Sequence, residues 1–82
     1  MKKNKYFIYH VSVIVERYNN VKDFDTFSFL IRNTLEPITR RNIYVEMQKQ
    51  FEYYNEFCPL EYKITNYEHD SLHIEKVGEI WL

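Results

Sequence analysis

Residues 5–18, KYFIYHVSVIVERY, decide the fold of this chain. Successive side chains of a strand point to opposite faces, so a stretch of alternating character indicates a strand with two different faces. One face would carry Phe7, Tyr9, Val11, Val13 and Val15, and the other Tyr6, Ile8, His10, Ser12, Ile14 and Glu16. Because aromatic and β-branched residues favour strands, the pattern predicts one long strand over these residues.

The composition of residues 19–23, NNVKD, predicts a turn. The segment 24–32 that follows has two interpretations. A helix capped by Asn20 and Asp23 would place Phe24, Phe27 and Ile31 on one face. The alternation over residues 26–32 instead predicts a strand with its phenylalanines on one side, and Thr, Phe and Ile all favour strands. We prefer the second interpretation, a strand that forms a hairpin with residues 5–18.

Residues 40–56 have the spacing of an amphipathic helix. Ile43, Met47, Phe51 and Tyr54 recur at intervals of four, four and three, and Tyr44 widens the apolar stripe. Pro37 restrains Glu36, Thr39 is a natural N-cap, and Ile38 can pack against Ile43 at the helix entry. Pro59 closes the segment.

Residues 60–67 alternate again, and the pattern predicts a third strand. Its inward residues would be Leu60, Tyr62 and Ile64, and its outward residues Glu61, Lys63, Thr65 and Tyr67. Residues 68–71 form a tight connection, and a fourth strand runs from Leu72 to about Lys76. The tail 78–82 either extends that strand or docks as a flap. The predicted fold is therefore α+β: a small antiparallel ββαββ sheet, made of two hairpins, with one amphipathic helix packed on one face.

The 82 residues are enough for one domain, residues 1–82, and too few for two. One cysteine, Cys58, cannot form an internal disulfide, which fits a reducing cytoplasm. The net charge of −1 disfavours a binder of duplex nucleic acid. The longest apolar run is too short to cross a bilayer, so we expect no membrane association. The single glycine, Gly78, excludes a glycine-rich phosphate loop.

No set of residues predicts catalysis. His69 and His73 have metal-ligand spacing only on a helix, and two ligands do not make a zinc site. Asp70, Ser71 and His73 lie in a predicted strand or its turn, where neighbours point to opposite faces and cannot form a relay. The acids Glu52 and Glu56 belong to the polar face of the helix. We therefore expect no catalytic residue, no metal, no cofactor and no enzymatic activity.

A single helix can cover only one face of the predicted sheet, so the other face meets water or a partner. We expect Tyr6, Ile8, Ile14 and Leu30 on that face, with Tyr67 beside them. Single exposed apolar residues are normal, whereas a cluster marks an interaction site. Arg40 and Arg41 at the helix start, with Arg32 near them in the chain, are either solvated or bind phosphate or an acidic partner surface, and we favour solvation. These eight residues are the candidate partner-binding set.

Three features of the chain resemble small uncharacterised proteins of phages and mobile elements from low-GC bacteria. They are residues 5–13, KYFIYHVSV, the helix entry Leu35-Glu36-Pro37-Ile38-Thr39, and residues 60–67. The richness in Lys, Asn, Ile and Tyr suits an AT-rich source. The resemblance carries no functional residues. It implies that the protein is an inhibitor of one host protein, as anti-CRISPR and other anti-defence factors are.

These observations predict a non-enzymatic, phage-encoded protein that blocks a bacterial host or immune-defence protein by covering its surface. The contact would use the exposed sheet face, a free sheet edge, or Arg40 and Arg41. One alternative is a module that binds nucleic acid or nucleotides through tyrosines and arginines. Another is a structural homodimer in which two apolar sheet faces pack together.

Overall fold

A long antiparallel hairpin forms the frame of the protein in the computed structural model, which describes residues 3–82. Strands β1 (Lys5–Arg17) and β2 (Lys22–Arg32) pair without interruption from Tyr6 opposite Arg32 to Glu16 opposite Lys22. Asn20 takes a left-handed conformation in the turn, with φ 66°, which asparagine tolerates better than most residues. The strand interpretation of residues 24–32 is confirmed, and the helical alternative is wrong.

β1 is the central strand of a four-stranded antiparallel sheet. β2 pairs with one edge of β1. Along the other edge, β3 (Ile64–Tyr67) pairs with the end of β1, and β4 (His73–Trp81) pairs with residues from Lys5 to Ser12. β3 and β4 therefore follow one another along β1, and the predicted second hairpin between them is wrong. A 3-10 turn, His69–Ser71, fills the gap: the Ile14 N–H donates to Ser71 Oγ at 2.8 Å, and the Glu68 N–H donates to the Ile14 carbonyl oxygen at 2.8 Å.

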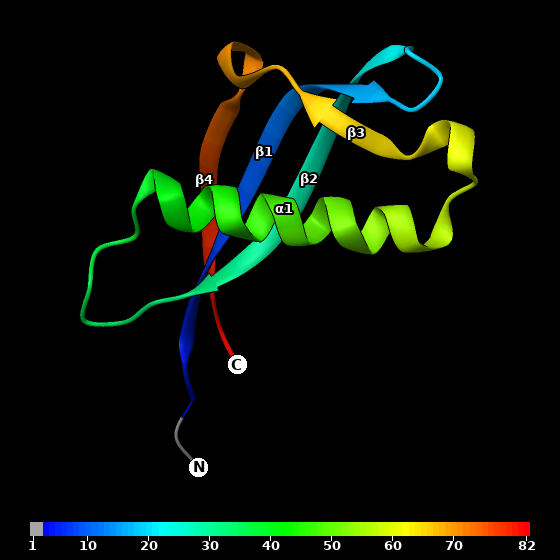
Figure 1. Cartoon of the computed structure of the whole chain (residues 1–82). Coiled ribbons are helices and arrows are strands. Elements are labelled where there is room, and N and C mark those ends of the chain that lie inside the picture. The colour runs from blue at the N-terminus through cyan, green and yellow to red at the C-terminus, as the bar shows by residue number, and fades with distance from the viewer. Residues whose placement is uncertain (1–2) are drawn as a thin grey trace.

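Helix α1 (Arg40–Phe57) crosses in front of the sheet and covers one face of it (Figure 1). Thr39 is the N-cap, as predicted, and forms a reciprocal capping box with Asn42. The Asn42 N–H donates to Thr39 Oγ1 at 3.3 Å, and the Thr39 N–H donates to Asn42 Oδ1 at 2.9 Å. The α+β architecture with one helix on one sheet face is thus confirmed.

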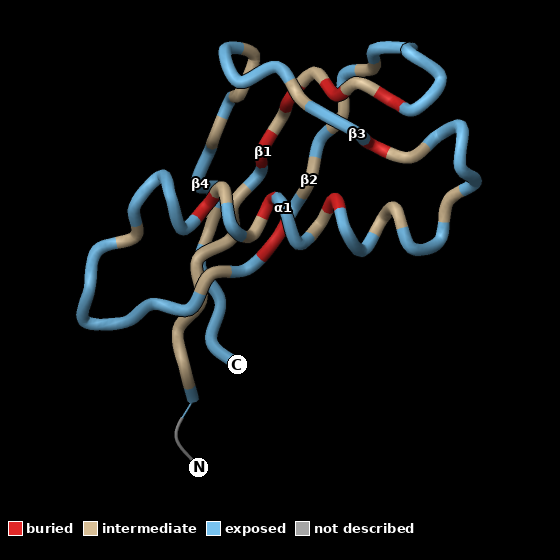
Figure 2. Tube along the Cα trace, viewed as in Figure 1, coloured by how far each residue is buried: buried red, intermediate tan, exposed pale blue. Residues whose placement is uncertain are grey.

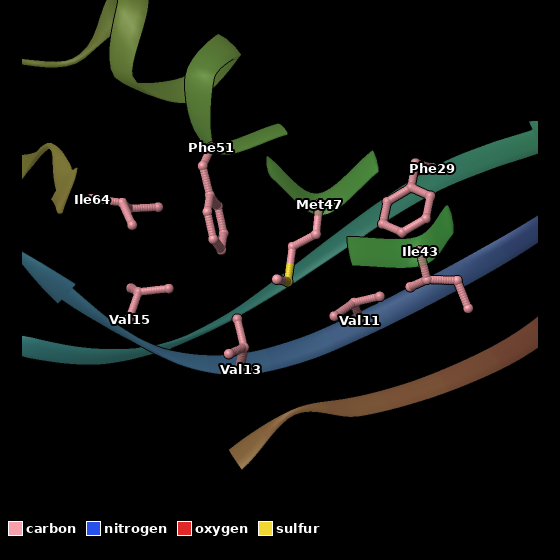
Figure 3. Close-up of a cluster of buried hydrophobic side chains, with 8 residues drawn as sticks. All are labelled: Val11, Val13, Val15, Phe29, Ile43, Met47, Phe51 and Ile64. Atoms are coloured by element: carbon pink, nitrogen blue, oxygen red, sulfur yellow. The ribbon is translucent and has the colours of Figure 1, made fainter. Parts of the chain in front are cut away.

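The core lies between the helix and the odd-numbered residues of the hairpin. Figure 2 shows the buried positions concentrated where α1, β1, β2 and β3 face one another. Figure 3 shows Met47 and Phe51 pointing from the helix toward Val11, Val13 and Val15 of β1. The three valines and Met47 are fully inaccessible to solvent. The buried cluster is Val11, Val13, Val15, Phe29, Ile43, Met47, Phe51 and Ile64. Of the predicted inward face, Val11, Val13 and Val15 are buried and Tyr9 packs against the buried cluster, whereas Phe7 does not belong to the core. The helix stripe is confirmed, with Ile43, Met47 and Phe51 buried and the tyrosines partly buried.

The segment 60–67 departs from the prediction of one continuous strand. Leu60–Tyr62 forms a 3-10 turn after Pro59, and Leu60 and Tyr62 are exposed instead of facing inward. Only Ile64 of the predicted inward set is buried. The C-terminal tail extends β4 as far as Trp81, and backbone hydrogen bonds between Leu82 and Asn4 continue the pairing.

Candidate functional site on the uncovered sheet face

The sheet face opposite α1 has no covering element among residues 3–82. Residues opposite one another on antiparallel strands share a face, so the register of β1 with β2 and β4 fixes its members. We call this surface the uncovered face. It comprises Tyr6, Ile8, His10, Ser12, Ile14 and Glu16 of β1, Lys22, Phe24, Thr26, Ser28, Leu30 and Arg32 of β2, and His73, Glu75 and Ile80 of β4. Of the candidate residues, Tyr6, Ile8, Ile14, Leu30 and Arg32 lie here.

The apolar residues of the uncovered face form two separate patches. In the first, Ile8 lies opposite Leu30, and Tyr6 lies opposite Ile80; Leu30 is 42% exposed and Ile80 39%. In the second, Ile14 lies opposite Phe24, which is 67% exposed. Six residues of strand separate Ile8 from Ile14, a distance of about 20 Å. We name them the Ile8 patch and the Ile14 patch.

A polar band lies between the two patches. His10 faces Ser28 on one side and Glu75 on the other, and the next rung places Ser12 between Thr26 and His73. The hydroxyl oxygens of Ser12 and Thr26 are 3.1 Å apart, within hydrogen-bond distance. No group of three His, Cys, Asp or Glu side chains within residues 3–82 has the geometry to hold a metal ion. The face therefore offers two apolar contacts at its ends and hydrogen-bonding groups in the middle.

Tyr67 does not belong to the uncovered face, and its predicted outward orientation is wrong. It lies opposite Val15, and its ring centroid is 5.7 Å from that of Phe51, on the helix side of the sheet. The cause is a β-bulge. Arg17 pairs with Ile64 and Glu16 with Asn66, so Thr65 is an extra residue that reverses the alternation of β3.

The three candidate arginines are not gathered in one place. Arg32 stands at the end of β2 and donates from Nη2 to Asn4 Oδ1 at 2.9 Å. Arg40 and Arg41 begin α1, on the other side of the sheet from the uncovered face. Arg40 donates from Nε to the Tyr44 hydroxyl at 3.2 Å. The structure therefore does not assemble an arginine cluster for one anionic ligand.

A buried charge at the end of β1, Arg17, was not predicted from the sequence. Its guanidinium pairs with the carboxylates of Asp23 and Asp25, and donates from Nη1 to the Tyr54 hydroxyl at 2.9 Å and to the Tyr62 carbonyl oxygen at 2.6 Å. Burial opposes the charged form of Arg17, but the hydrogen bond with Asp23 and the charge of Asp25 outweigh it and raise the pKa. This network ties the hairpin, the helix end and the 3-10 turn together. The two aspartates at alternate positions of β2 are the feature of the sequence that could have indicated a buried cation.

A second feature that sequence reasoning missed is an aromatic flank at the C-terminal end of α1. Tyr53 and Phe57 are 66% and 71% exposed, and their ring centroids are 5.2 Å apart in an edge-to-face arrangement. Together with Gln50, Tyr54 and Cys58 they line a shallow hollow on the helix. Tyr53 and Phe57 are four residues apart, a spacing that places them on one side of a helix and is visible in the sequence.

Comparison of the chain with protein-family models, with curated proteins and with solved structures finds no match in any of the three. Within residues 3–82, no helix has the length and apolar character needed to cross a membrane.

Proposed function

We propose that this domain is a non-enzymatic inhibitor, encoded by a phage or mobile element, that binds a bacterial host or immune-defence protein and blocks it by occlusion. The observation that supports the proposal is the uncovered face, where Phe24 and Leu30 expose apolar surface on a rigid sheet. Exposed apolar residues on a fixed scaffold are the usual anchors of a protein interface, and a polar surround gives it specificity.

The charges of the uncovered face favour a protein partner over nucleic acid. Its cations are Lys22 and Arg32, and its acids are Glu16 and Glu75, so the face has no basic excess. Lys22 is already paired with Glu68, with Nζ and Oε1 2.6 Å apart. Binding to a phosphate backbone would require several free cations in a row. A protein surface requires only complementary shape and a few polar contacts.

The test compares three forms of the purified domain in capture from a bacterial lysate. Leu30→Glu places a charge on the uncovered face, and Val45→Glu places the same charge on α1, at a side chain of similar exposure (42% and 47%). We expect wild type and Val45→Glu to retain one protein and Leu30→Glu to lose it, with unchanged circular dichroism. The captured protein is then purified, and its activity should fall on addition of equimolar wild type but not of Leu30→Glu.

Two outcomes contradict the proposal. Inhibition by a folded Leu30→Glu variant would remove the uncovered face as the site. Absence of any captured protein, together with a dimer in analytical ultracentrifugation at micromolar concentration, would favour the homodimer.

A further inference from the structure

The outer edge of β2 is unpaired. β1 occupies the inner edge of this strand along its whole length, from Lys22 to Arg32, and no other strand within residues 3–82 pairs with the opposite edge. An unpaired edge of this length is a template on which another chain can form backbone hydrogen bonds.

Two hydrogen bonds at the ends of the hairpin show which peptide groups of β2 point outward. The Arg17 N–H donates to the Val21 carbonyl oxygen at 2.9 Å, and the Asn33 N–H donates to the Lys5 carbonyl oxygen at 2.8 Å. Hydrogen-bonded pairs alternate with non-bonded pairs in an antiparallel ladder, so in this uninterrupted register the odd-numbered pairs are bonded. The even-numbered residues of β2 therefore point their N–H and C=O groups away from β1. None of these outward groups has a hydrogen-bond partner among the described residues.

Several usual protections of an edge strand are missing from β2, and its inward-pointing charges, Asp23 and Asp25, are paired with Arg17. The strand contains no proline, and its ladder with β1 has no bulge. Its even-numbered side chains are Phe24, Thr26, Ser28 and Leu30, with cations only at the two ends, Lys22 and Arg32. The outward N–H and C=O groups of the four central even-numbered residues are therefore accessible to an added strand.

We propose that the partner contributes an extended segment that adds to the outer edge of β2 as a fifth strand. This inference rests on the proposed function, because it specifies how the protein partner is held. The backbone groups of β2 supply the hydrogen bonds, and side-chain contacts select the segment. Lys22 is paired with Glu68, so Arg32 at the other end of the edge favours a segment with an acidic residue near that end and alternating apolar and polar residues along its length.

Helix α1 passes over β2, beside the edge at which such a segment would add. Phe51 lies over β2, where its ring centroid is 5.1 Å from that of Phe27. Figure 1 shows the helix continuing past β2 on its free side. The six residues that follow Phe51, as far as Phe57, add about 9 Å to the helix, close to two strand spacings. Tyr53 lies about 200° around the helix from Phe51 and points away from the sheet. The added segment would therefore contact the flank of α1 beside Phe51.

A second copy of this chain fits the edge poorly. A symmetric antiparallel pairing of two β2 strands over their full length would place Lys22 opposite Arg32 at both ends, which is a like-charge contact. The centre of that pairing is at Phe27, where Phe51 of α1 lies over β2, so the helix of the second copy would meet the first. A partner segment without a helix over it avoids both conflicts.

The test uses a short peptide of alternating valine and threonine with one glutamate at each end, titrated into the isotopically labelled domain and followed by amide NMR. We expect the largest shifts, and slowed hydrogen exchange, at the amides of Phe24, Thr26, Ser28 and Leu30. Ser28→Pro removes one outward N–H and leaves the ladder with β1 intact, whereas Ser28→Ala keeps that N–H. The proline variant should bind about tenfold more weakly, the loss expected for one hydrogen bond, and the alanine variant should bind as wild type does.

The outcomes separate this inference from the proposed function. If no amide of β2 responds at millimolar peptide, or if folded Ser28→Pro binds as well as Ser28→Ala, edge addition is wrong. If Ser28→Pro still inhibits the captured host protein and Leu30→Glu does not, strand addition at the edge of β2 is wrong and the uncovered face remains the binding site. A dimer that Ser28→Pro disperses would replace the partner segment with a second copy. Should Ser28→Pro fail to fold, the shifts of the wild-type amides decide alone.

Discussion

The Nη2 atom of Arg17 lies 2.8 Å from Oδ2 of Asp25, and this ion pair connects the last residue of β1 to the helix side of β2. The side chain of Arg17 is 9% exposed, whereas those of Asp23 and Asp25 are 44% and 28% exposed. The pair is therefore buried at its cationic end and partly solvated at its acidic end. The burial of this cation is compensated by two carboxylates and by hydrogen bonds to Tyr54 and the Tyr62 carbonyl, so losing it would leave several polar groups without a partner.

Replacing Arg17 with methionine should destabilise the domain by about 1–3 kcal/mol, less than a fully buried pair would cost because water can solvate the released aspartates. Urea unfolding followed by circular dichroism measures the change. Tyr54→Phe is the matched control, since it removes one acceptor of the network and should cost about 1 kcal/mol. An Arg17→Met variant as stable as wild type would show that the network contributes specificity but no stability.

Met47 is the largest of the fully buried side chains in the core. It is fully inaccessible and lies among Val11, Val13 and Phe51 (Figure 3). Met47→Ala should lower the free energy of unfolding by about 2–5 kcal/mol through lost burial and the cavity left behind. Met47→Leu keeps the volume and should cost less than about 1.5 kcal/mol. Equal losses for the two variants in thermal unfolding would contradict this account of the core.

The fold was predictable where each segment carries its own signal. The alternation of residues 5–18 predicted β1 with the correct inward face, and the apolar spacing with Thr39 predicted α1 and its cap. A strand repeats its apolar residues with a period of 2, a helix repeats them with a period of 3.6, and a helix cap depends on adjacent residues. All three signals can be read from a single sequence. Five of the eight candidate residues lie on the uncovered face for the same reason.

The errors arose where pairing between distant strands decides the outcome. Alternation shows that a segment is a strand but not which strand it pairs with, so β3 and β4 were predicted as a hairpin when both pair with β1. The bulge at Thr65 then reversed the side of Tyr67. A second irregularity in the β1–β4 register lies between Ile8 and Tyr9. It leaves Val77 as an extra residue, so the side chains of β4 change faces there. Arg17 was missed because its partners lie on three other segments.

Gly78 offers a stabilising substitution beside the Ile8 patch. It does not adopt a positive φ, and a Cβ added there would meet Ile8 Cδ1 at 3.6 Å, an ordinary van der Waals contact. Gly78→Ala should therefore raise the free energy of unfolding by about 0.4–1 kcal/mol, because alanine restricts the unfolded chain and adds a contact. Chemical denaturation compares the variant with wild type. A loss of stability would mean that β4 has to adjust its backbone at the neighbouring bulge.

Glu79 makes part of the stability depend on pH. Its carboxylate lies 2.9 Å from Lys5 Nζ and 3.1 Å from Lys76 Nζ, and the hydrogen bonds with Lys5 and then Lys76 lower its pKa. Since the unfolded chain binds this proton more readily than the folded one, the contribution is complete above the unfolded pKa of about 4.3. It is lost as the pH falls through the lowered folded value.

Glu79→Gln should consequently be less stable than wild type at neutral pH, and the difference should shrink on acidification. Unfolding of both proteins in urea at neutral and at strongly acidic pH measures it, and added salt should reduce the neutral-pH difference because the groups are exposed. Lys49 pairs with Glu46 on α1, at 3.2 Å, so Glu46→Gln is a control for an ion pair within one helix. If the difference in unfolding free energy between wild type and Glu79→Gln grows as the pH falls, the folded pKa of Glu79 is not lowered. A carboxyl group stabilises the folded protein more at acidic pH only when its folded pKa is raised.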